Sequence, residues 1–304
     1  MSQDASPPAS PYRLFDVTLK AKEPLSPHLW RLTFAGPEVN RMAAFAPDQR
    51  IKIFFPDPQG RPPAMAITPD WYARYKKQDV ATRPPMRTYT IRALRAPAGE
   101  VDVDFVLHGE TGPASTWATH AQPGQALQIM APNAAFEGDG GGYEWKPPQG
   151  LRRLLLIADE TALPAVAGIL EELAALPAPP QTQLFIEIPG QDDEIPLAGW
   201  PDLWVEWMPR GLGAPGALMV AAAQRAAVPV ATPRPAPTPA LAEVDVDEAI
   251  LWDVAAPSDA GFYGWVAGEA AAVLAIRRLL IAERKVDKAS LNLMGYWREG
   301  RVLD

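Results

Sequence analysis

Cysteine is absent from this chain, and only three of its 304 residues are histidine. The absence of cysteine excludes disulfide bonds, thiolate-bound iron–sulfur clusters and zinc–thiolate sites together. His28 and His120 lie too far apart in the chain to suggest a metal cluster, so we predict no metal site. Any electron carrier of this protein must therefore be a bound organic cofactor or a separate protein.

Long apolar runs are also missing, and the charge balance is acidic. No stretch of roughly 18 apolar residues occurs, so we predict no transmembrane helix and no membrane insertion. Residues 1–11 lack the basic and apolar regions of a signal peptide, and we expect them to form a disordered tail on a cytoplasmic protein. The net charge of −8 argues against nucleic acid and anionic membranes as partners.

The first half of the chain has the pattern of a β-domain. Short runs rich in β-branched and aromatic residues are separated by turns that contain proline or glycine. In the run 101–107, Val101, Val103 and Phe105 alternate with polar residues, as in a strand with one buried face. The predicted strands are 13–21, 29–34, 51–55, 88–94, 101–107 and 125–130, with one helix at 114–121. Residues 12–136 are therefore predicted to form a six-stranded antiparallel β-barrel, whose closure removes exposed edges.

The second half changes to strands that alternate with helices, so two domains are expected. The apolar run 154–158 is typical of a buried parallel strand, and a helical pattern follows at 164–175. Further strands are predicted at 184–188, 203–207, 263–267 and 291–294, and further helices at 216–227 and 269–284. This alternation indicates a parallel α/β domain over 153–304, after a linker at 137–152. A proline-rich insertion at 228–240 is expected to form a surface loop.

Arg87 and Tyr89 stand at alternating positions of one predicted strand, within Arg-Thr-Tyr-Thr-Ile-Arg. Alternate side chains of a strand share a face, so this face offers a guanidinium to a phosphate and an aromatic ring to a flat heterocycle. Further along the chain, Gly112 and Ser115 indicate a turn into a helix, whose free N–H groups suit a pyrophosphate. One ligand uses all of these groups, namely a dinucleotide with a planar redox ring.

Simpler interpretations of the same residues stay open. The strand can be an ordinary amphipathic strand with a solvent-facing Arg87, and Gly112 to Ser115 can be a plain helix cap. Arg92, at the end of the same run, is either a second phosphate contact or a surface charge.

Arg-x-Tyr-Thr followed by Gly-x-x-Ser resembles the flavin signature of the ferredoxin-reductase-like superfamily. The sequence is most similar to the siderophore-interacting proteins, which are FAD-dependent ferric-siderophore reductases. The similarity runs through most of the chain in consistent order and spacing. Its segments are 25–28, 31–33, 50–56, 87–92, 108–118, 158–165, 265–270 and 295–298.

The resemblance implies FAD as the cofactor. It implies that Arg87 holds an FAD phosphate, that Tyr89 packs on the flavin or its ribityl chain, and that Thr90 hydrogen-bonds near the reactive N5. Tyr89 and Thr90 are thus the catalytic candidates. His108 is expected to hydrogen-bond the cofactor or its loop, because hydride transfer to a flavin needs no protein base. The other predicted FAD contacts in this half are Gly109, Gly112, Ala114 and Ser115.

Asp159, Glu160 and Thr161 follow the first predicted parallel strand, where α/β sheets place ligands. No Gly-x-Gly-x-x-Gly occurs there. The resemblance puts Asp159 and Thr161 near the FAD adenosine and the path of the nicotinamide of NADH or NADPH. Glu269 is either a ligand contact or a charge at a helix N-terminus. Arg210 is either a contact for a 2′-phosphate or a surface residue.

By resemblance, Lys52, Arg298 and Arg301 line a cavity over the flavin and attract an anionic ferric siderophore. The alternative for each is a solvated surface cation. Arg277 and Arg278 lie on a predicted helix, and we expect both on its surface.

These features predict a two-domain flavoprotein that reduces the iron of a ferric siderophore, with NADH, NADPH or ferredoxin as electron donor. One alternative is a general flavin reductase or a ferredoxin-reductase-type electron-transfer protein with a protein partner. Another is a siderophore-binding protein without turnover. The residues name neither the siderophore nor the donor.

Overall fold

In the computed structural model, the chain divides into two compact units, Met1–Tyr143 and Glu144–Asp304. The structure describes residues 9–66, 68, 70–110, 112–229, 250–256 and 261–301. Most of the predicted N-terminal tail and of the proline-rich insertion at 228–240 lies outside these residues.

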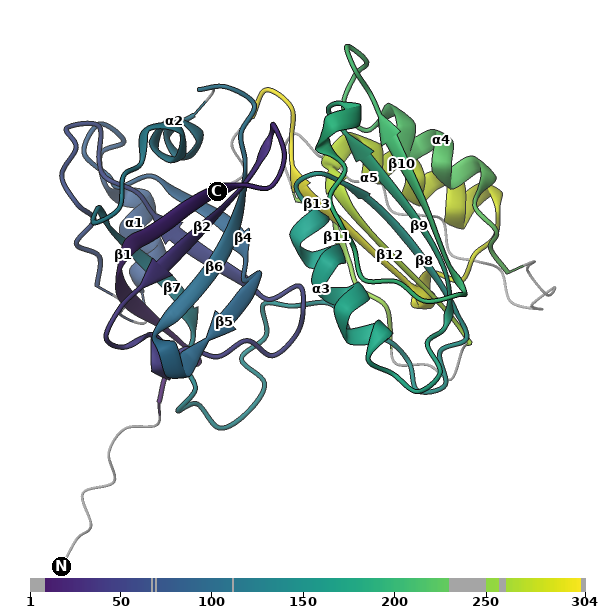
Figure 1. The fold of residues 1–304 in the computed structure, drawn as a ribbon, viewed down its shortest axis with the longest axis horizontal. Coiled ribbons are helices and arrows are strands. Elements are labelled where there is room, and N and C mark those ends of the chain that lie inside the picture. Colours follow the sequence, from purple (N-terminus) through teal and green to yellow (C-terminus); the bar gives the residue numbers. More distant parts are fainter. Residues whose placement is uncertain are drawn as a thin grey trace, which may run out of the picture. The chain divides into compact units, whose positions relative to one another are not determined.

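Unit 1 is a curled antiparallel sheet of seven strands (Figure 1). The strand order is β4–β3–β7–β1–β2–β6–β5. The strands are β1 (Tyr12–Pro24), β2 (Leu29–Ala35), β3 (Arg50–Phe54), β4 (Met86–Thr90), β5 (Ala93–Arg95), β6 (Glu100–Val106) and β7 (Ala126–Pro132). Val101, Val103 and Phe105 of β6 are buried in the core inside the curled sheet, as the alternation predicts.

The count of seven strands corrects the six predicted, because the expected strand 88–94 is divided at Ile91 and Arg92. The Ile91 N–H donates to Gln49 O, beside β3, whereas the Arg92 N–H donates to Asp102 O in β6 (both 2.9 Å). The chain therefore changes partner from one end of the sheet to the other. Both ends are joined through this segment, which curls the sheet toward a barrel.

Among the described residues of unit 1 there are two α-helices, although only one is expected from the sequence. Helix α2 (Pro113–His120) matches the prediction, while α1 (Trp71–Lys77) does not. The sequence does not indicate α1, because this helix has seven residues and only Tyr75 among them is buried. Tyr75 packs edge-on against Phe54, at 6.0 Å between ring centroids, on the side of β3 away from the main core. Short 3₁₀ turns occur at Val39–Arg41 and Ala96–Ala98.

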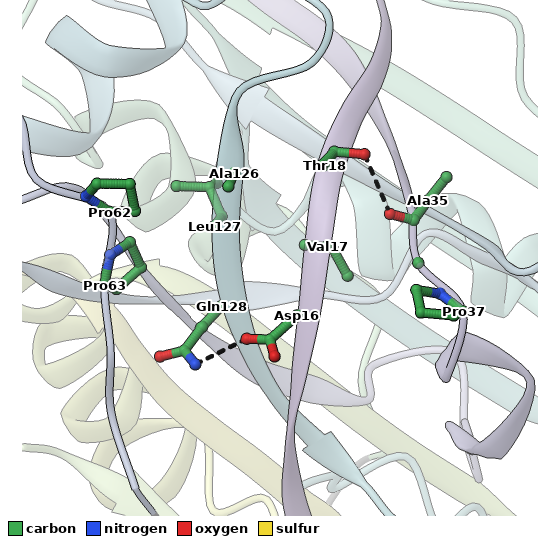
Figure 2. A pocket seen from close by; sticks show the side chains of 11 residues that line it. Asp16, Val17, Thr18, Ala35, Pro37, Pro62, Pro63, Ala126, Leu127 and Gln128 are labelled. Atoms are coloured by element: carbon green, nitrogen blue, oxygen red, sulfur yellow. Dashed lines mark hydrogen bonds between the residues drawn. The ribbon is translucent and has the colours of Figure 1, made fainter.

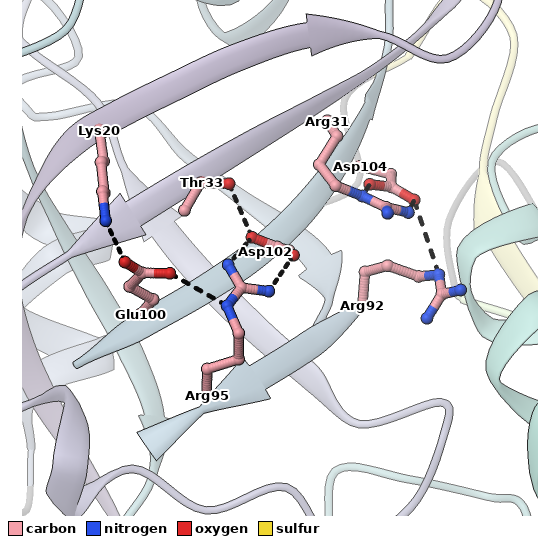
Figure 3. A network of polar contacts seen from close by, with 8 residues as sticks. All are labelled: Lys20, Arg31, Thr33, Arg92, Arg95, Glu100, Asp102 and Asp104. Atoms are coloured by element: carbon pink, nitrogen blue, oxygen red, sulfur yellow. Dashed lines mark hydrogen bonds and ion pairs between the residues drawn. The ribbon is translucent and has the colours of Figure 1, made fainter. Parts of the chain in front are cut away.

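The outer face of β6 carries acidic residues that are paired with arginines of neighbouring strands (Figure 3). Asp104 accepts two hydrogen bonds from Arg31, at 2.7 and 2.9 Å, and Arg92 lies 3.9 Å from it. Asp102 accepts two from Arg95, at 2.5 and 2.7 Å. Both aspartates are buried, where an unpaired charge would be costly. Arg92 is thus an ion-pair partner within the sheet.

Unit 2 contains a six-stranded sheet in the order β10–β9–β8–β12–β13–β11. Its strands are β8 (Arg153–Asp159), β9 (Gln181–Ile188), β10 (Leu203–Pro209), β11 (Trp252–Asp253), β12 (Phe262–Glu269) and β13 (Leu291–Trp297). Five strands are parallel, but β11 is antiparallel to β13, so the sheet is mixed rather than wholly parallel. A two-residue strand leaves too little pattern to be recognised in the sequence.

The helices of unit 2 cover both faces of this sheet (Figure 1). They are α3 (Leu163–Ala174), α4 (Ala217–Arg225) and α5 (Ala270–Arg277), and α5 continues as a π-helix over Arg278–Glu283. Helices α4 and α5 share one apolar core with the sheet. Arg277 is buried and forms an ion pair with Asp253, in which 2.6 Å separates Nε from Oδ2. The prediction of a surface position for Arg277 is therefore wrong.

Candidate functional site

Arg87 and Tyr89 share one face of β4, as their alternation predicts. In the antiparallel pair β3–β4, Arg87 lies opposite Ile53 and Tyr89 opposite Ile51. Both isoleucines belong to the core inside the curled sheet. The guanidinium and the phenol ring therefore stand on the inner side of β4, at an end of the sheet.

Tyr89 is half-buried and packs against other aromatic rings. Its ring centroid lies 4.2 Å from that of Phe105 and 6.4 Å from that of Phe55. Burial raises the pKa of the Tyr89 hydroxyl, which stays protonated at neutral pH. One side of the ring is fixed by packing, and the exposed remainder can contact a planar ligand.

Thr90 and Lys52 belong to the opposite face of the β3–β4 pair. Thr90 lies opposite Arg50, and Lys52 lies opposite Thr88. The Lys52 ammonium donates to Thr88 Oγ1 at 3.3 Å. Thr90 is buried, at the point where β4 ends. The structure thus separates Lys52 and Thr90 from the face that carries Arg87 and Tyr89.

The glycine turn leads directly into α2. The Gly112 N–H donates to Ser115 Oγ at 3.1 Å, and this hydroxyl donates back to Gly112 O at 3.0 Å. Ala114 packs into the core and fixes the helix against unit 1. The first N–H groups of a helix have no acceptor within it. A Cβ added at Gly109 or Gly112 would meet no atom within 4 Å, so open space lies beside this turn.

His108, which is predicted to contact the cofactor, is exposed. It lies beside His28, a neighbour that the sequence does not indicate. The rings of His28 and His108 are 5.8 Å apart between centroids. The antiparallel register of β2 and β6 brings them together, since Leu29 pairs with Val106. Only the strand pairing could have revealed this neighbour.

At the carboxyl edge of the unit 2 sheet, the Asp159 side chain joins three strands. Its Oδ2 accepts from the backbone N–H of Glu269 at 2.9 Å and from Trp297 Nε1–H at 2.7 Å. Its Oδ1 accepts from the N–H of Thr161 at 2.9 Å. Asp159 ends β8, Glu269 ends β12 and Trp297 ends β13. In the sheet, β9 and β10 lie on one side of β8, whereas β12 and β13 lie on the other side, so the strand order reverses at β8. Ligands of α/β sheets bind at such a switch point.

The environment of Asp159 perturbs its ionisation. Burial, and then the charge of Glu160, raise the pKa of Asp159 to about 7, against the donors from Thr161 and Trp297 that favour the carboxylate. Gly268 has φ +156°, and a Cβ there would lie 2.6 Å from Asp159 Oδ2. The carboxylate therefore fits only beside a glycine.

Arg210 is bound inside unit 2 rather than exposed on its surface. Its Nη1 and Nη2 donate to the two carboxylate oxygens of Glu160 at 2.7 and 2.6 Å. Nη1 also lies 3.6 Å from Oε1 of Glu187. Of the two interpretations of Arg210, a surface residue is thus wrong.

Glu269 caps α5, because its Oε2 accepts from the Ala272 N–H at 2.9 Å. Its Oε1 accepts from Nη1 of Arg298 at 2.8 Å. Arg298 is therefore an ion-pair partner of a helix cap. Arg301 forms an isolated β-bridge with Arg298 and is exposed.

A cavity of about 450 Å³ lies on unit 1 between β1, β7 and the segment that precedes α1 (Figure 2). Its lining includes Pro37, Pro62 and Pro63, and Gln128 donates to Asp16 Oδ1 at 2.8 Å beside them. None of the predicted site residues lines this cavity. It is therefore separate from the candidate cofactor groups.

Two family models match consecutive parts of the chain. A siderophore-interacting FAD-binding domain matches residues 18–136, and a siderophore-interacting protein domain matches residues 151–300. The chain belongs to the siderophore-interacting protein family. Family membership confirms the resemblance predicted from the motifs, and it assigns unit 1 to the FAD-binding type.

Relatives of this family are similar along nearly the whole chain. An uncharacterised protein of Mycobacterium tuberculosis is 34% identical, over 96% of this chain and 92% of its own length. The ferric vibriobactin reductase ViuB of Vibrio cholerae is 26% identical, over 95% of this chain and 90% of its own. The crystal structure of a siderophore utilization protein from T. fusca superposes with a TM-score of 0.73, at 25% identity, over 97% and 96% of the two chains.

Helix length bears on the membrane prediction. Among the helices of the described residues, none has the length and apolarity needed to cross a bilayer.

Proposed function

We propose that this protein is an FAD-dependent reductase of ferric siderophores that releases ferrous iron in the cytoplasm. NADH or NADPH is the proposed electron donor. The observation that carries the proposal is the shared face of Arg87 and Tyr89 on β4, within the part of the chain matched by an FAD-binding domain. The similarity to a ferric vibriobactin reductase over both units supports the same reaction.

The groups present in unit 1 fit FAD. Arg87 supplies a cation for a phosphate, and the first turn of α2 supplies N–H groups beside Gly112, where open space lies. Tyr89 supplies an aromatic surface for a planar ring. Ser115 holds the turn in shape through its two hydrogen bonds to Gly112. The donor set thus suits both the pyrophosphate and the ring of FAD.

When bound, FAD would take a hydride from the nicotinamide donor and supply two electrons, one at a time, to two ferric centres. The residues of this chain hold and orient the reactants. Tyr89 is proposed to lie nearest the flavin ring, whereas the side chain of Thr90 is buried on the opposite face of β4. His108 and Gly109 are proposed to contact the cofactor from the loop before α2.

The cations proposed to attract an anionic chelate differ in their surroundings. Lys52 lies on β3 with its ammonium near the exposed Thr88, and Arg301 is exposed. Arg298 is held by Glu269, so its charge is largely balanced. Lys52, Arg298 and Arg301 are the cations proposed to capture the ferric siderophore by charge.

The proposed reaction is tested in the absence of oxygen, by following reduction of the flavin and formation of ferrous iron. The purified protein is loaded with FAD, titrated with NADH or NADPH until the flavin absorbance bleaches, and then mixed with a ferric siderophore and a ferrous-specific chelator. We expect return of the oxidised flavin spectrum together with formation of the ferrous complex. Bleaching without formation of ferrous iron would indicate a general flavin reductase. Absence of FAD binding would refute the proposal.

A further inference from the structure

The cation that the sequence offers for a 2′-phosphate is already engaged. The Arg210 guanidinium makes a two-pronged ion pair with Glu160, and only 10% of its side chain is exposed. The Glu160 side chain is 4% exposed. Arg210 could turn to an added phosphate only by leaving a buried carboxylate without its partner, which is strongly unfavourable.

Glu187 is fixed in place on the other side of Arg210. Its carboxylate is fully buried and accepts from the N–H groups of Gly216, Leu218 and Met219, at 2.6, 2.9 and 3.2 Å. These groups form the N-terminus of α4. These hydrogen bonds fix the Glu187 carboxylate in place. If Arg210 turned toward a phosphate, Glu187 would therefore stay at its position without this cation.

The remaining groups at this edge also disfavour an added anion. Glu269 caps the N-terminus of α5, and its second oxygen is bound to Arg298. Carboxylates of the chain itself thus accept from three N–H groups at the start of α4 and from one in the first turn of α5. The acids Glu160, Glu187 and Glu269 outnumber the cations Arg210 and Arg298, so the carboxyl edge of the sheet is negative.

Building on the proposed reductase function, we propose that unit 2 selects NADH over NADPH, with Arg210, Glu160 and Glu187 as the specificity-determining residues. The nucleotides differ only by the 2′-phosphate, which adds up to two negative charges. NADH carries a neutral 2′-hydroxyl at that position, which the negative charge of this edge does not repel. Both donors deliver the same hydride and leave as the oxidised nucleotide, so the selection acts on binding.

Binding and reduction are measured on the FAD-loaded protein. Calorimetry with the oxidised nucleotides gives affinity without turnover, and anaerobic bleaching gives the concentration dependence of flavin reduction by NADH and NADPH. We expect about tenfold or greater preference for the nucleotide without the 2′-phosphate at low salt, a preference that narrows at high salt. Equal or tighter binding of the phosphorylated nucleotide would overturn the proposal.

A charge-neutral variant tests the assigned residues. Glu160→Gln removes the two-pronged partner of Arg210, so we expect affinity for the phosphorylated nucleotide to rise several-fold, with about twofold or smaller change for the other. Glu206→Gln is the matched control, since it makes the same charge change at the exposed Arg225–Glu206 pair of unit 2. The same rise in both variants, or in neither, would refute the assignment. If Glu160→Gln does not fold, the comparison of nucleotides on the unaltered protein still decides.

Flavin bleaching by the nucleotides and formation of ferrous iron are separate readouts, so the selection of NADH and the reductase function are tested independently. If neither nucleotide bleaches the flavin, but the dithionite-reduced protein still converts ferric siderophore to ferrous iron, the reductase function stands and the selection of NADH is refuted. If NADH bleaches the flavin selectively and no ferrous iron forms, the selection stands and the reductase function is refuted.

Discussion

The Asp159 carboxylate accepts a hydrogen bond from the indole of Trp297, with 2.7 Å between Oδ2 and Nε1, across 138 positions of sequence. The same oxygen accepts the Glu269 N–H. One buried side chain therefore holds the ends of β8, β12 and β13 together. No local pattern around Trp297 indicates this partner, which only the structure shows.

The raised pKa of Asp159 predicts a pH dependence of stability. In the folded state Asp159 keeps its proton up to about pH 7, whereas in the unfolded state it loses the proton near the ordinary aspartate pKa of 3.8. Between these values the folded state binds more protons, so the free energy of unfolding falls as pH rises through this window. Asp159→Asn cannot titrate, and we expect it to flatten the fall in melting temperature between about pH 4 and pH 7.

Asp202→Asn is the control for this measurement, because Asp202 is exposed in the same unit. Thermal unfolding is followed by circular dichroism at each pH. An unchanged slope in Asp159→Asn would show that another group is responsible.

Gly268→Ala should destabilise unit 2. The added Cβ would lie 2.6 Å from Asp159 Oδ2, and φ at this position is +156°. We expect a loss of about 2–4 kcal/mol in the free energy of unfolding, measured by chemical denaturation. Gly199→Ala is the matched control, since the nearest atom to a Cβ there is 3.9 Å away. Similar losses in both variants would contradict the proposed steric cause.

Arg87→Ala should weaken FAD binding. One charge-assisted contact contributes about 1.5–3 kcal/mol, which corresponds to roughly a 10- to 150-fold higher Kd. The affinity is measured by quenching of flavin fluorescence on titration of apoprotein. Arg74→Ala on α1 removes an exposed arginine and should leave the Kd unchanged. Unchanged affinity in a folded Arg87→Ala variant would argue against this phosphate contact.

Lys52→Glu should impair capture of the substrate without impairing FAD binding. Lys52 lies on the opposite face of the β3–β4 pair from Arg87 and Tyr89, so the flavin Kd should not change. We expect the apparent KM for an anionic ferric siderophore to rise roughly two- to tenfold at low salt and less at high salt, because salt screens exposed charges.

Steady-state iron release at two ionic strengths measures this effect. Lys77→Glu makes the same charge change at the exposed end of α1 and serves as control. An equal rise in KM for both variants would indicate an effect of overall charge, and no rise for Lys52→Glu would place the capture surface elsewhere.

Local patterns in the sequence predicted much of the fold. The alternation in β6, the apolar run of β8 and the strand–helix order of unit 2 depend on side-chain periods of neighbouring residues, which are visible without the structure. The shared face of Arg87 and Tyr89 is of the same kind. The motifs also identified the family, because their order and spacing are properties of the chain.

The tertiary structure decided which distant residues meet. The change of partner at Ile91 and Arg92, which gives seven strands rather than six, depends on hydrogen bonds to Gln49 and Asp102. Local periodicity carries no information about such partners. For the same reason, the sequence does not show that Arg210 and Arg298 are paired. The order of the strands places Glu160 beside Arg210 and Glu269 beside Arg298. Charge along a chain is set by sequence, whereas the neutralisation of a charge depends on the packing of separate strands and helices.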